Sequence, residues 1–365
     1  MDIAVFGGAF DPFHSQHKKI IKACKDELNV DKVIVVPSFS PPHKSSPLSK
    51  FEDRLAMVKA GVKGMDYVII DTIERERNTS NPTSEVLPVL KEKYPSDSFY
   101  FVIGGDSIEH FHTWIKPELI AKSAILAVVK RQGYNDHLAA IERAKKDYNA
   151  KILLLNITGE EVSSSIIKAT LELGLEPQNI DKEIYSIIKK RKMYNEFSAI
   201  IDKLKNSIPK DTFEHSVSTT LFAMKYITKL KLSYQKVFLA CILHDCAKHI
   251  KMETPGVPLA VSHQYVGAEY AQSQYGITDS EIINAIKCHT SGKPNMSKLD
   301  KLVYVADMLE PSRDFDGVEE LRQELDKDFE KGFYLCVKRS MQKLAKDKKP
   351  IYPLTNSCLK YYTNK

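Results

Sequence analysis

The chain has 365 residues, which is enough for two hydrophobic cores. Its 43% hydrophobic and 27% charged residues are typical of a globular protein. The net charge of +6 is compatible with phosphate-bearing substrates, but it is too small and too evenly spread to predict binding of DNA or RNA.

No apolar run is long enough to span a bilayer, and the first ten residues lack the basic and apolar regions of a signal peptide. The six cysteines are scattered without a Cys-x-x-Cys pair, which indicates reduced thiols. We therefore expect a cytoplasmic protein with no membrane or nucleic-acid partner. The sequence leaves open whether the chain forms a homo-oligomer.

Strand-like and helix-like segments alternate through the first half of the chain, which predicts an α/β fold with a parallel sheet. The strand-like runs are continuously apolar, as in sheets that are buried on both faces. They are Ile3–Phe6, Lys32–Val36, Tyr67–Ile70, Phe99–Ile103, Ile125–Val129 and Ile152–Leu155. The amphipathic segments between them include His14–Leu28, Phe51–Val62 and Ser84–Lys93.

Beyond about residue 190 the pattern becomes helical throughout, which predicts an all-α second domain. We place the boundary near Tyr194, giving domains of residues 1–194 and 195–365. The expected helices are Phe197–Ile208, Thr212–Leu230, Tyr234–His244, Tyr265–Tyr275, Asp279–Cys288, Lys298–Met308 and Val318–Leu344.

A glycine-rich string, Gly7-Gly8-Ala9-Phe10-Asp11-Pro12-Phe13-His14-Ser15-Gln16-His17, stands where the first strand ends and the first helix begins. Without a Cβ, Gly7 and Gly8 allow backbone N–H groups to approach a phosphate. His14 and His17 are three residues apart and would share one face of a helix. The string therefore predicts a site for a polyphosphate.

This string resembles the GxFDPxHxxH signature of the nucleotidyltransferase superfamily, which has a Rossmann-like fold. Later motifs resemble those of bacterial nicotinate mononucleotide adenylyltransferases. They are Pro41-Pro42-His43-Lys44, the strand and turn Phe101–Asp106 followed by Trp114, the turn Val129–Gly133, and the helix start Glu161–Lys168. The resemblance covers Met1 to about Tyr194.

The resemblance implies transfer of AMP from ATP to nicotinate mononucleotide, with Mg²⁺ bridging the ATP phosphates. It assigns catalysis to His14, His17 and Lys44. It assigns ATP binding to Gly7, Gly8, Phe10, His14, His17, Ser163, Ser164, Ser165 and Lys168. It assigns substrate binding to Lys44, Thr83, Gly105, Asp106, Trp114 and Arg131. Serine hydroxyls and free N–H groups at a helix start make physical sense as an anion site.

The sequence departs from this family at several positions. Lys168 replaces an arginine and so lacks a planar fork for phosphate, and Gln132 replaces a proline. Asn81-Pro82-Thr83 stands where the family has Ser-Tyr-Thr. The choice between nicotinate and nicotinamide mononucleotide therefore stays open. A phosphopantetheine substrate is disfavoured by the Pro-Pro-His-Lys loop and by Trp114.

The second half carries imidazoles and carboxylates within or beside the expected helices. They are His215, His244, Asp245, His263, His289 and Asp307. Such ligands suit Fe, Mn or Zn, and six of them exceed what one tetrahedral ion needs. Two ions are therefore expected, with Asp245 as the bridging ligand and a catalytic residue. The remaining histidines, His110, His112, His137 and His249, are expected at the surface.

This constellation and its flanking residues resemble the YqeK-type HD phosphohydrolases, which are bacterial symmetrical diadenosine tetraphosphate hydrolases with a di-iron centre. The resemblance implies two Fe or Mn ions, a dinucleoside polyphosphate substrate, and phosphate contacts from Lys248, Thr290 and Arg313. Two alternatives stay open for this domain: hydrolysis of another nucleotide phosphoester, or nucleotide binding that regulates the first domain without catalysis.

Overall fold

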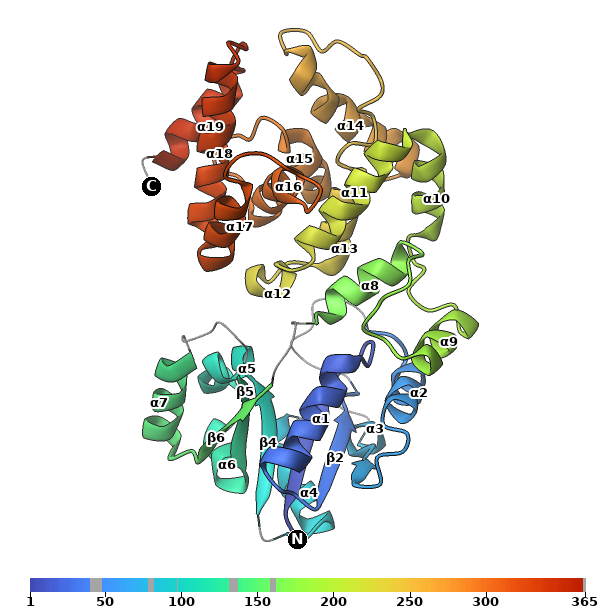
Figure 1. Cartoon of the computed structure of the whole chain (residues 1–365), viewed down its shortest axis with the longest axis vertical. Coiled ribbons are helices and arrows are strands. Elements are labelled where there is room, and N and C mark those ends of the chain that lie inside the picture. The colour runs from blue at the N-terminus through green and yellow to red at the C-terminus, as the bar shows by residue number, and fades with distance from the viewer. Residues whose placement is uncertain (40–47, 78–81, 97, 131–136, 158–161, 364–365) are drawn as a thin grey trace. The chain divides into compact units, whose positions relative to one another are not determined.

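A computed structural model describes residues 1–39, 48–77, 82–96, 98–130, 137–157 and 162–363. The chain forms two compact units (Figure 1), one of Met1–Ile167 and Pro177–Met193, the other of Lys168–Glu176 and Tyr194–Lys365. Helix α8, Ser164–Glu172, therefore begins in the first unit and ends in the second. The candidate residues Lys44 and Arg131 lie outside the described residues, as do Pro41–His43, Asn81, Gln132, Gly133 and Glu161 of the motifs.

The first unit is built on a parallel sheet of six strands in the order β3-β2-β1-β4-β5-β6. The predicted parallel α/β architecture is thereby confirmed. The strands are β1 Ile3–Gly8, β2 Lys32–Pro37, β3 Val68–Ile70, β4 Phe99–Gly104, β5 Ile125–Lys130 and β6 Ile152–Asn156. The chain runs outward from β1 in one direction and then outward from β4 in the other. The strand order therefore reverses between β1 and β4, where open α/β sheets bind their ligands.

Helices lie on both sides of this sheet (Figure 1). One face buries Ile3 and Val5 of β1 against Leu87, Ile120 and Ile141 of the surrounding helices. Side chains alternate along a strand, so Ala4 and Phe6, which are also buried, face the opposite side. The helices of this part are α1 Ser15–Glu27, α2 Phe51–Gly61, α3 Ile73–Glu76, α4 Thr83–Lys93, α5 Gly105–Glu109, α6 Pro117–Ser123, α7 His137–Tyr148 and α9 Lys182–Lys190.

The second unit is helical throughout its described residues, as the sequence predicts. Helices α11, α13, α15 and α16 pack against one another and form its centre. The helices are α10 Ser198–Ser207, α11 Lys210–Ala223, α12 Ile227–Leu230, α13 Tyr234–Leu243, α14 Leu259–Tyr275, α15 Ser280–Cys288, α16 Lys298–Leu309, α17 Val318–Lys327, α18 Phe329–Lys346 and α19 Pro353–Thr363.

Some helix limits differ from the expected ones for local reasons. The expected helix Val318–Leu344 breaks at Asp328, whose side chain accepts a hydrogen bond from the N–H of Lys331 and so caps a new helix. The expected helix Thr212–Leu230 is interrupted between Ala223 and Ile227. Helix α14 begins six residues before Tyr265, which places His263 inside a helix.

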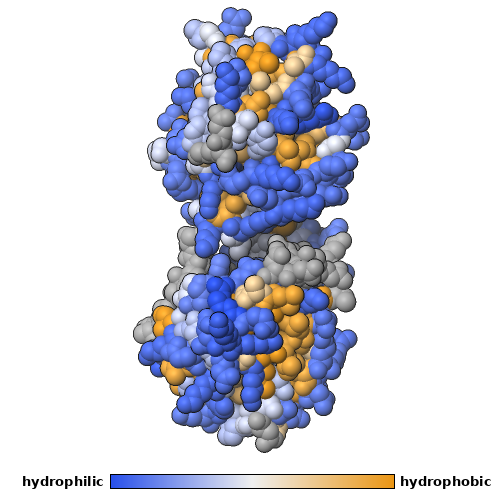
Figure 2. Space-filling view, turned by 90° about the vertical axis from the view of Figure 1, so that its left-hand side faces the viewer, coloured by the Kyte–Doolittle hydropathy of each residue, from blue (hydrophilic) through white to orange (hydrophobic). Residues whose placement is uncertain are grey.

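All six cysteines are buried free thiols, as expected for a chain without disulfides. Among the described residues, no helix combines the length and the apolar composition that a membrane span requires. Figure 2 shows a largely hydrophilic face with a group of apolar side chains on the first unit. The exposed apolar side chains of that unit include Leu153 and Leu154 of the edge strand β6, each 44% exposed.

Candidate functional sites

Two glycine turns flank the point where the strand order reverses. Gly7 and Gly8 end β1, and Gly104 ends β4 directly before Gly105 begins α5. Strands β1 and β4 are neighbours in the sheet, so these turns lie at the same edge of it. The fold thus brings two sequence motifs, separated by about a hundred residues, to one candidate ligand site.

His14 and His17 are held together by the start of helix α1. The sequence predicts a helix that begins at His14. In the structure, His14 has extended backbone angles and directly precedes the first residue of the helix. The backbone N–H of His14 donates to Nδ1 of His17 over 3.1 Å, and the two rings lie 3.8 Å apart. Because Nδ1 of His17 accepts this bond, a neutral His17 carries its proton on Nε2. The second nitrogen is thereby fixed as a donor.

Aromatic side chains surround the His17 ring. Phe10 and Phe13 lie 5.0 Å and 5.2 Å from it, and Phe6 lies 6.0 Å away, between ring centroids. A Cβ on Gly8 would meet the Phe10 ring at 3.1 Å, which is tighter than most side-chain contacts. A side chain at this position would therefore press on the Phe10 ring, which in turn packs against His17.

The serines at the start of α8 lie beside this histidine pair. Nε2 of His14 is 3.1 Å from Oγ of Ser164. The hydroxyl of Ser163 accepts a hydrogen bond from the N–H of Ser165 at 3.3 Å and so caps the helix start. The structure therefore joins the glycine loop to the triple serine. Lys168 lies one turn further along the helix, with its ammonium 5.6 Å from the ring centroid of Tyr194.

Burial lowers the pKa of His14 from 6.5 to about 4. The unfolded chain therefore binds a proton between pH 6.5 and 4 that the folded domain excludes. The free energy of unfolding should fall as the pH drops through this window, by on the order of 3 kcal/mol from this group, and stay level below it. Urea unfolding followed by the fluorescence of Trp114, the only tryptophan, measures this loss. His14→Asn should show a smaller loss than the wild type.

The matched control for this measurement is His110→Asn, because His110 is exposed. It should retain the full pH dependence of the wild type. Equal pH dependence in His14→Asn and the wild type would contradict the expected role of His14.

The candidate substrate-binding residues lie around the second glycine turn and at a neighbouring helix start. Thr83 is the first residue of α4. Asp106 is exposed in the first turn of α5. Trp114 is half-buried, and its ring packs against Phe101 and Phe111 at centroid distances of 6.3 Å and 5.7 Å. This packing leaves Trp114 as both a part of the core and an accessible aromatic surface.

His137 is not at the surface as expected, because only 5% of it is exposed. Its Nδ1 lies 3.0 Å from a carboxylate oxygen of Glu109. A Cβ on Gly105 would lie 2.1 Å from His137 Nε2, so only glycine fits there. His137 therefore packs against the turn that presents Asp106. No motif or spacing around His137 indicates this contact.

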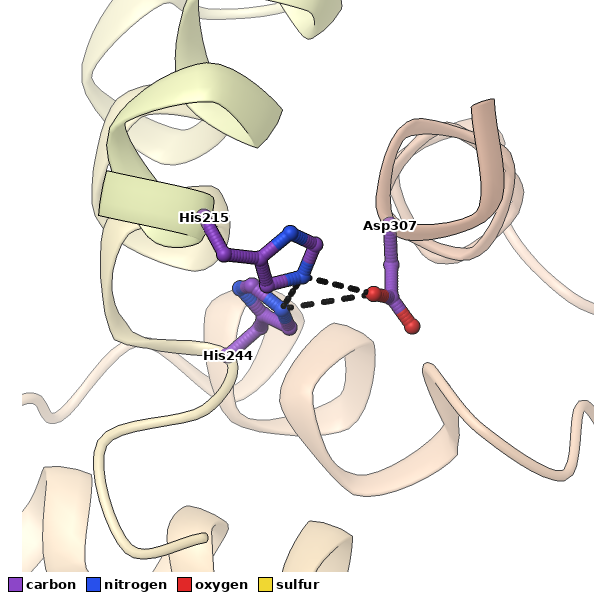
Figure 3. Close-up of side chains that lie close together, drawn as sticks. All are labelled: His215, His244 and Asp307. Carbon is purple, nitrogen blue, oxygen red and sulfur yellow. Dashed lines mark hydrogen bonds and ion pairs between the residues drawn. The ribbon is translucent and has the colours of Figure 1, made fainter. Parts of the chain in front are cut away.

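In the second unit, His215, His244 and Asp307 point toward one another from α11, from the end of α13 and from α16 (Figure 3). Nε2 of His215 is 2.8 Å from Oδ1 of Asp307 and 3.3 Å from Nε2 of His244. Nε2 of His244 is 3.7 Å from the same carboxylate oxygen. These atoms form one group that could hold a metal ion.

Asp245 connects this group to a second one. Its Oδ2 lies 3.4 Å from Nε2 of His244. Its Oδ1 lies 3.5 Å from Nε2 of His263 and 3.4 Å from Nε2 of His289. The structure thus brings together all six residues that the sequence analysis proposed as ligands. One carboxylate faces both pairs of imidazoles.

The imidazoles are oriented by hydrogen bonds on their far nitrogens. Nδ1 of His244 lies 2.7 Å from the carbonyl of Cys241, and Nδ1 of His289 lies 2.7 Å from that of Ile286. A carbonyl only accepts, so each Nδ1 is the donor and each neutral Nε2 presents a lone pair to the centre. Nδ1 of His215 lies 3.1 Å from the buried carboxylate of Glu310, which the sequence analysis did not single out as an orienting group.

The carboxylates at the centre of these six residues favour a positive charge beside them. Burial opposes ionisation of His244, but the carboxylates of Asp245 and Asp307 outweigh it and raise its pKa to about 10. Burial would likewise raise the pKa of Asp245, yet His244 and His289 hold it below its usual range. Oδ1 of Asp245 is buried without a hydrogen-bond donor among the described residues. Converging lone pairs and an unpartnered carboxylate oxygen fit a divalent cation.

The candidate phosphate-binding residues lie at the border of this centre. Nζ of Lys248 is 2.6 Å from Oδ2 of Asp245. Nη2 of Arg313 is 2.7 Å from Oδ1 of Asp307. Oγ1 of Thr290 is 3.0 Å from Nε2 of His263. Each therefore contacts a candidate metal ligand directly, and Lys248 and Arg313 add positive charge at this border.

Comparisons with known proteins follow this division. Residues 5–170 match a cytidylyltransferase-like family model, and residues 212–312 match the HD domain model. A probable nicotinate-nucleotide adenylyltransferase/Ap4A hydrolase of Mycoplasma genitalium is 28% identical over 365 residues, covering 94% of this chain and 99% of that protein. A probable nicotinate-nucleotide adenylyltransferase of Rubrobacter xylanophilus is 31% identical over 198 residues, covering 53% of this chain and 92% of that protein.

Among solved structures, an HD superfamily hydrolase of Clostridium acetobutylicum, described as involved in NAD metabolism, is 26% identical. It matches 46% of this chain and 97% of that one, with a TM-score of 0.43.

Fold, sites and family models together define a nucleotidyltransferase-like domain followed by an HD domain with a cluster suited to divalent metal. More narrowly, the chain belongs to the nicotinate-nucleotide adenylyltransferase family, and its likeness to the Mycoplasma genitalium protein extends through the HD domain.

Proposed function

We propose that the chain is a bifunctional enzyme, with an adenylyltransferase domain over residues 1–194 and an HD phosphohydrolase domain over residues 195–365. The first domain transfers AMP from ATP to nicotinate mononucleotide. The second hydrolyses diadenosine tetraphosphate symmetrically to two ADP. The names of the relatives with the same domain order support both activities.

In the first reaction, a phosphate oxygen of the mononucleotide attacks the α-phosphorus of ATP. The bond from the α-phosphorus to the bridging oxygen breaks, and pyrophosphate leaves. No protein nucleophile is needed, so positioning and charge neutralisation provide the catalysis. Mg²⁺ bound with ATP supplies further charge neutralisation.

The observation that carries this proposal is the 3.1 Å contact between His14 and Ser164, which joins the glycine turn to the serine-rich helix start. A triphosphate placed between them meets N–H groups of the turn, the serine hydroxyls and Nε2–H of His17. An anionic phosphate next to His14 would raise the pKa of this imidazole again and strengthen its hydrogen bond. Lys44 and Lys168 would add positive charge.

For the second reaction, the observation that carries the proposal is Asp245, whose two oxygens face two separate imidazole pairs. We propose that these ligands hold two ions, Fe or Mn, with Asp245 between them. When bound, such a pair supplies an activated water and neutralises the phosphate. Lys248 and Arg313, which contact Asp245 and Asp307, would bind the polyphosphate oxygens.

A product assay of the intact protein tests both activities. With ATP, Mg²⁺ and each pyridine mononucleotide in turn, the nicotinate form should yield its adenine dinucleotide and pyrophosphate. With diadenosine tetraphosphate and Fe²⁺ or Mn²⁺, ADP should be the only nucleotide product. Formation of ATP and AMP would exclude symmetrical cleavage. Absence of hydrolysis across a panel of nucleotide phosphoesters would leave the domain as a regulator.

A further inference from the structure

Arg54 of helix α2 is a charged side chain in the core of the first unit, only 1% exposed. Burying a cation costs free energy unless polar groups surround it. The hydrogen-bond partners of Arg54 therefore indicate its role. No motif surrounds Arg54 in the sequence. Its neighbours in the chain, Asp53 and Leu55, belong to an ordinary amphipathic helix.

The guanidinium donates to the backbone of segments that are separate in the sequence. Nη1 donates to the carbonyl of Ala9 at 2.7 Å, directly after the glycine turn. Nη2 donates to the carbonyl of Phe39 at 3.3 Å, just after β2. Nε donates to the carbonyl of Ser49 at 3.0 Å, just before α2. One planar fork thus binds three chain segments, which a lysine ammonium on a flexible stem does not do in a fixed plane.

Further contacts tie the same segments together. The N–H of Phe39 donates to Glu74 at 3.0 Å, and the N–H of Ser49 donates to Asp11 at 3.3 Å. The N–H of Ser38 donates to the carbonyl of Gly8 at 2.8 Å. The glycine turn is therefore fixed by the same network that fixes Phe39 and Ser49.

The segment that Arg54 binds includes a strained residue. Phe10, directly after Ala9, has a φ of 49°, which lies in the left-handed region that non-glycine residues avoid. Such a conformation persists only where the surroundings enforce it. Arg54 holds the carbonyl of the residue directly before Phe10, and the Phe10 ring packs against His17 with centroids 5.0 Å apart.

We propose that Arg54 is a positioning residue for the phosphate loop, holding Ala9 so that the amides of Gly7 and Gly8 meet the ATP phosphates in one geometry. This inference rests on the proposed adenylyltransferase function of the first domain. Arg54 acts through the backbone and touches neither substrate. Its loss should therefore weaken ATP binding even where the fold survives.

The test is calorimetric titration of the full chain with a non-hydrolysable ATP analogue. For Arg54→Met we expect the Kd to rise about tenfold or more, and for Arg54→Lys by less, because a misplaced binding group loses most of its value. The KM for ATP should rise in parallel. Arg75→Met is the matched control. The guanidinium groups of Arg54 and Arg75 lie 5.4 Å and 5.6 Å from the Phe51 ring centroid, but the Arg75 side chain is 50% exposed and paired with Glu52.

Trp114 fluorescence during urea unfolding shows which variants are folded. If Arg54→Met does not fold, Arg54→Lys decides the question. A folded variant at Arg54 that binds the analogue as tightly as the wild type overturns the inference. A wild type that binds the analogue but transfers no AMP to any pyridine mononucleotide refutes the proposed function. The Arg54 variants still test the binding role in that case.

Discussion

Replacing Asp245 by asparagine is expected to abolish hydrolysis of diadenosine tetraphosphate, lowering kcat/KM by more than about a hundredfold, while adenylyl transfer stays unchanged. Asparagine keeps the size of the side chain but removes the charge shared by the two imidazole pairs. In asparagine, an amide nitrogen takes the place of one carboxylate oxygen. This nitrogen would face Lys248 or the imidazole lone pairs, and it cannot act as a metal ligand as the oxygen does. Metal analysis of the purified variant should show fewer bound ions per chain than in the wild type.

Asp202→Asn provides the control for this change, because Asp202 is an exposed carboxylate on α10 of the same unit. It should alter neither metal content nor either activity. If Asp245→Asn kept the metal content and the hydrolysis rate of the wild type, the six side chains would have only a structural role, as paired charges within the helical core. Loss of both activities at once would mean that the two domains depend on each other.

The features that could be predicted from the sequence are those that a pattern of neighbouring residues reveals. Continuous apolar runs such as Ile3–Phe6 indicate buried parallel strands. The His244-Asp245 pair, with further histidines and Asp307 at helical positions, indicates a convergent centre. Both kinds of feature depend on local patterns. The residues of each segment indicate its secondary structure, and the fold then brings the segments together.

Residues whose roles arise from distant partners were not predictable. Arg54 binds Ala9, 45 positions away, and His137 packs on Gly105, 32 positions away. Glu310 orients His215 from 95 positions away. Nothing next to these residues in the chain indicates their partners. His14 illustrates the same limit on a smaller scale, because its spacing from His17 suggested a shared helix face whereas the contact comes from the way the helix is capped.

Changes at His17 separate the two nitrogens of its ring. His17→Ala is expected to lower the kcat of adenylyl transfer about a hundredfold or more, because a fixed donor to the developing phosphate charge is lost. His17→Asn keeps an acceptor near the position of Nδ1, so it should preserve the bond from the His14 N–H and the fold but lose a similar amount of kcat. His17→Gln can place an amide N–H near the position of Nε2 and should recover part of the rate.

The hydrolase of the same chain serves as an internal reference, since it should be equally active in all three variants. The loss should appear mainly in kcat, with a smaller change in the KM for ATP, because the bond to Nε2 strengthens as charge builds up in the transition state. If His17→Asn turned over at the wild-type rate, Nε2 would not be the donor and the glycine loop would be misassigned. If all three variants lost only stability, the ring would serve solely to pack against Phe10 and Phe13.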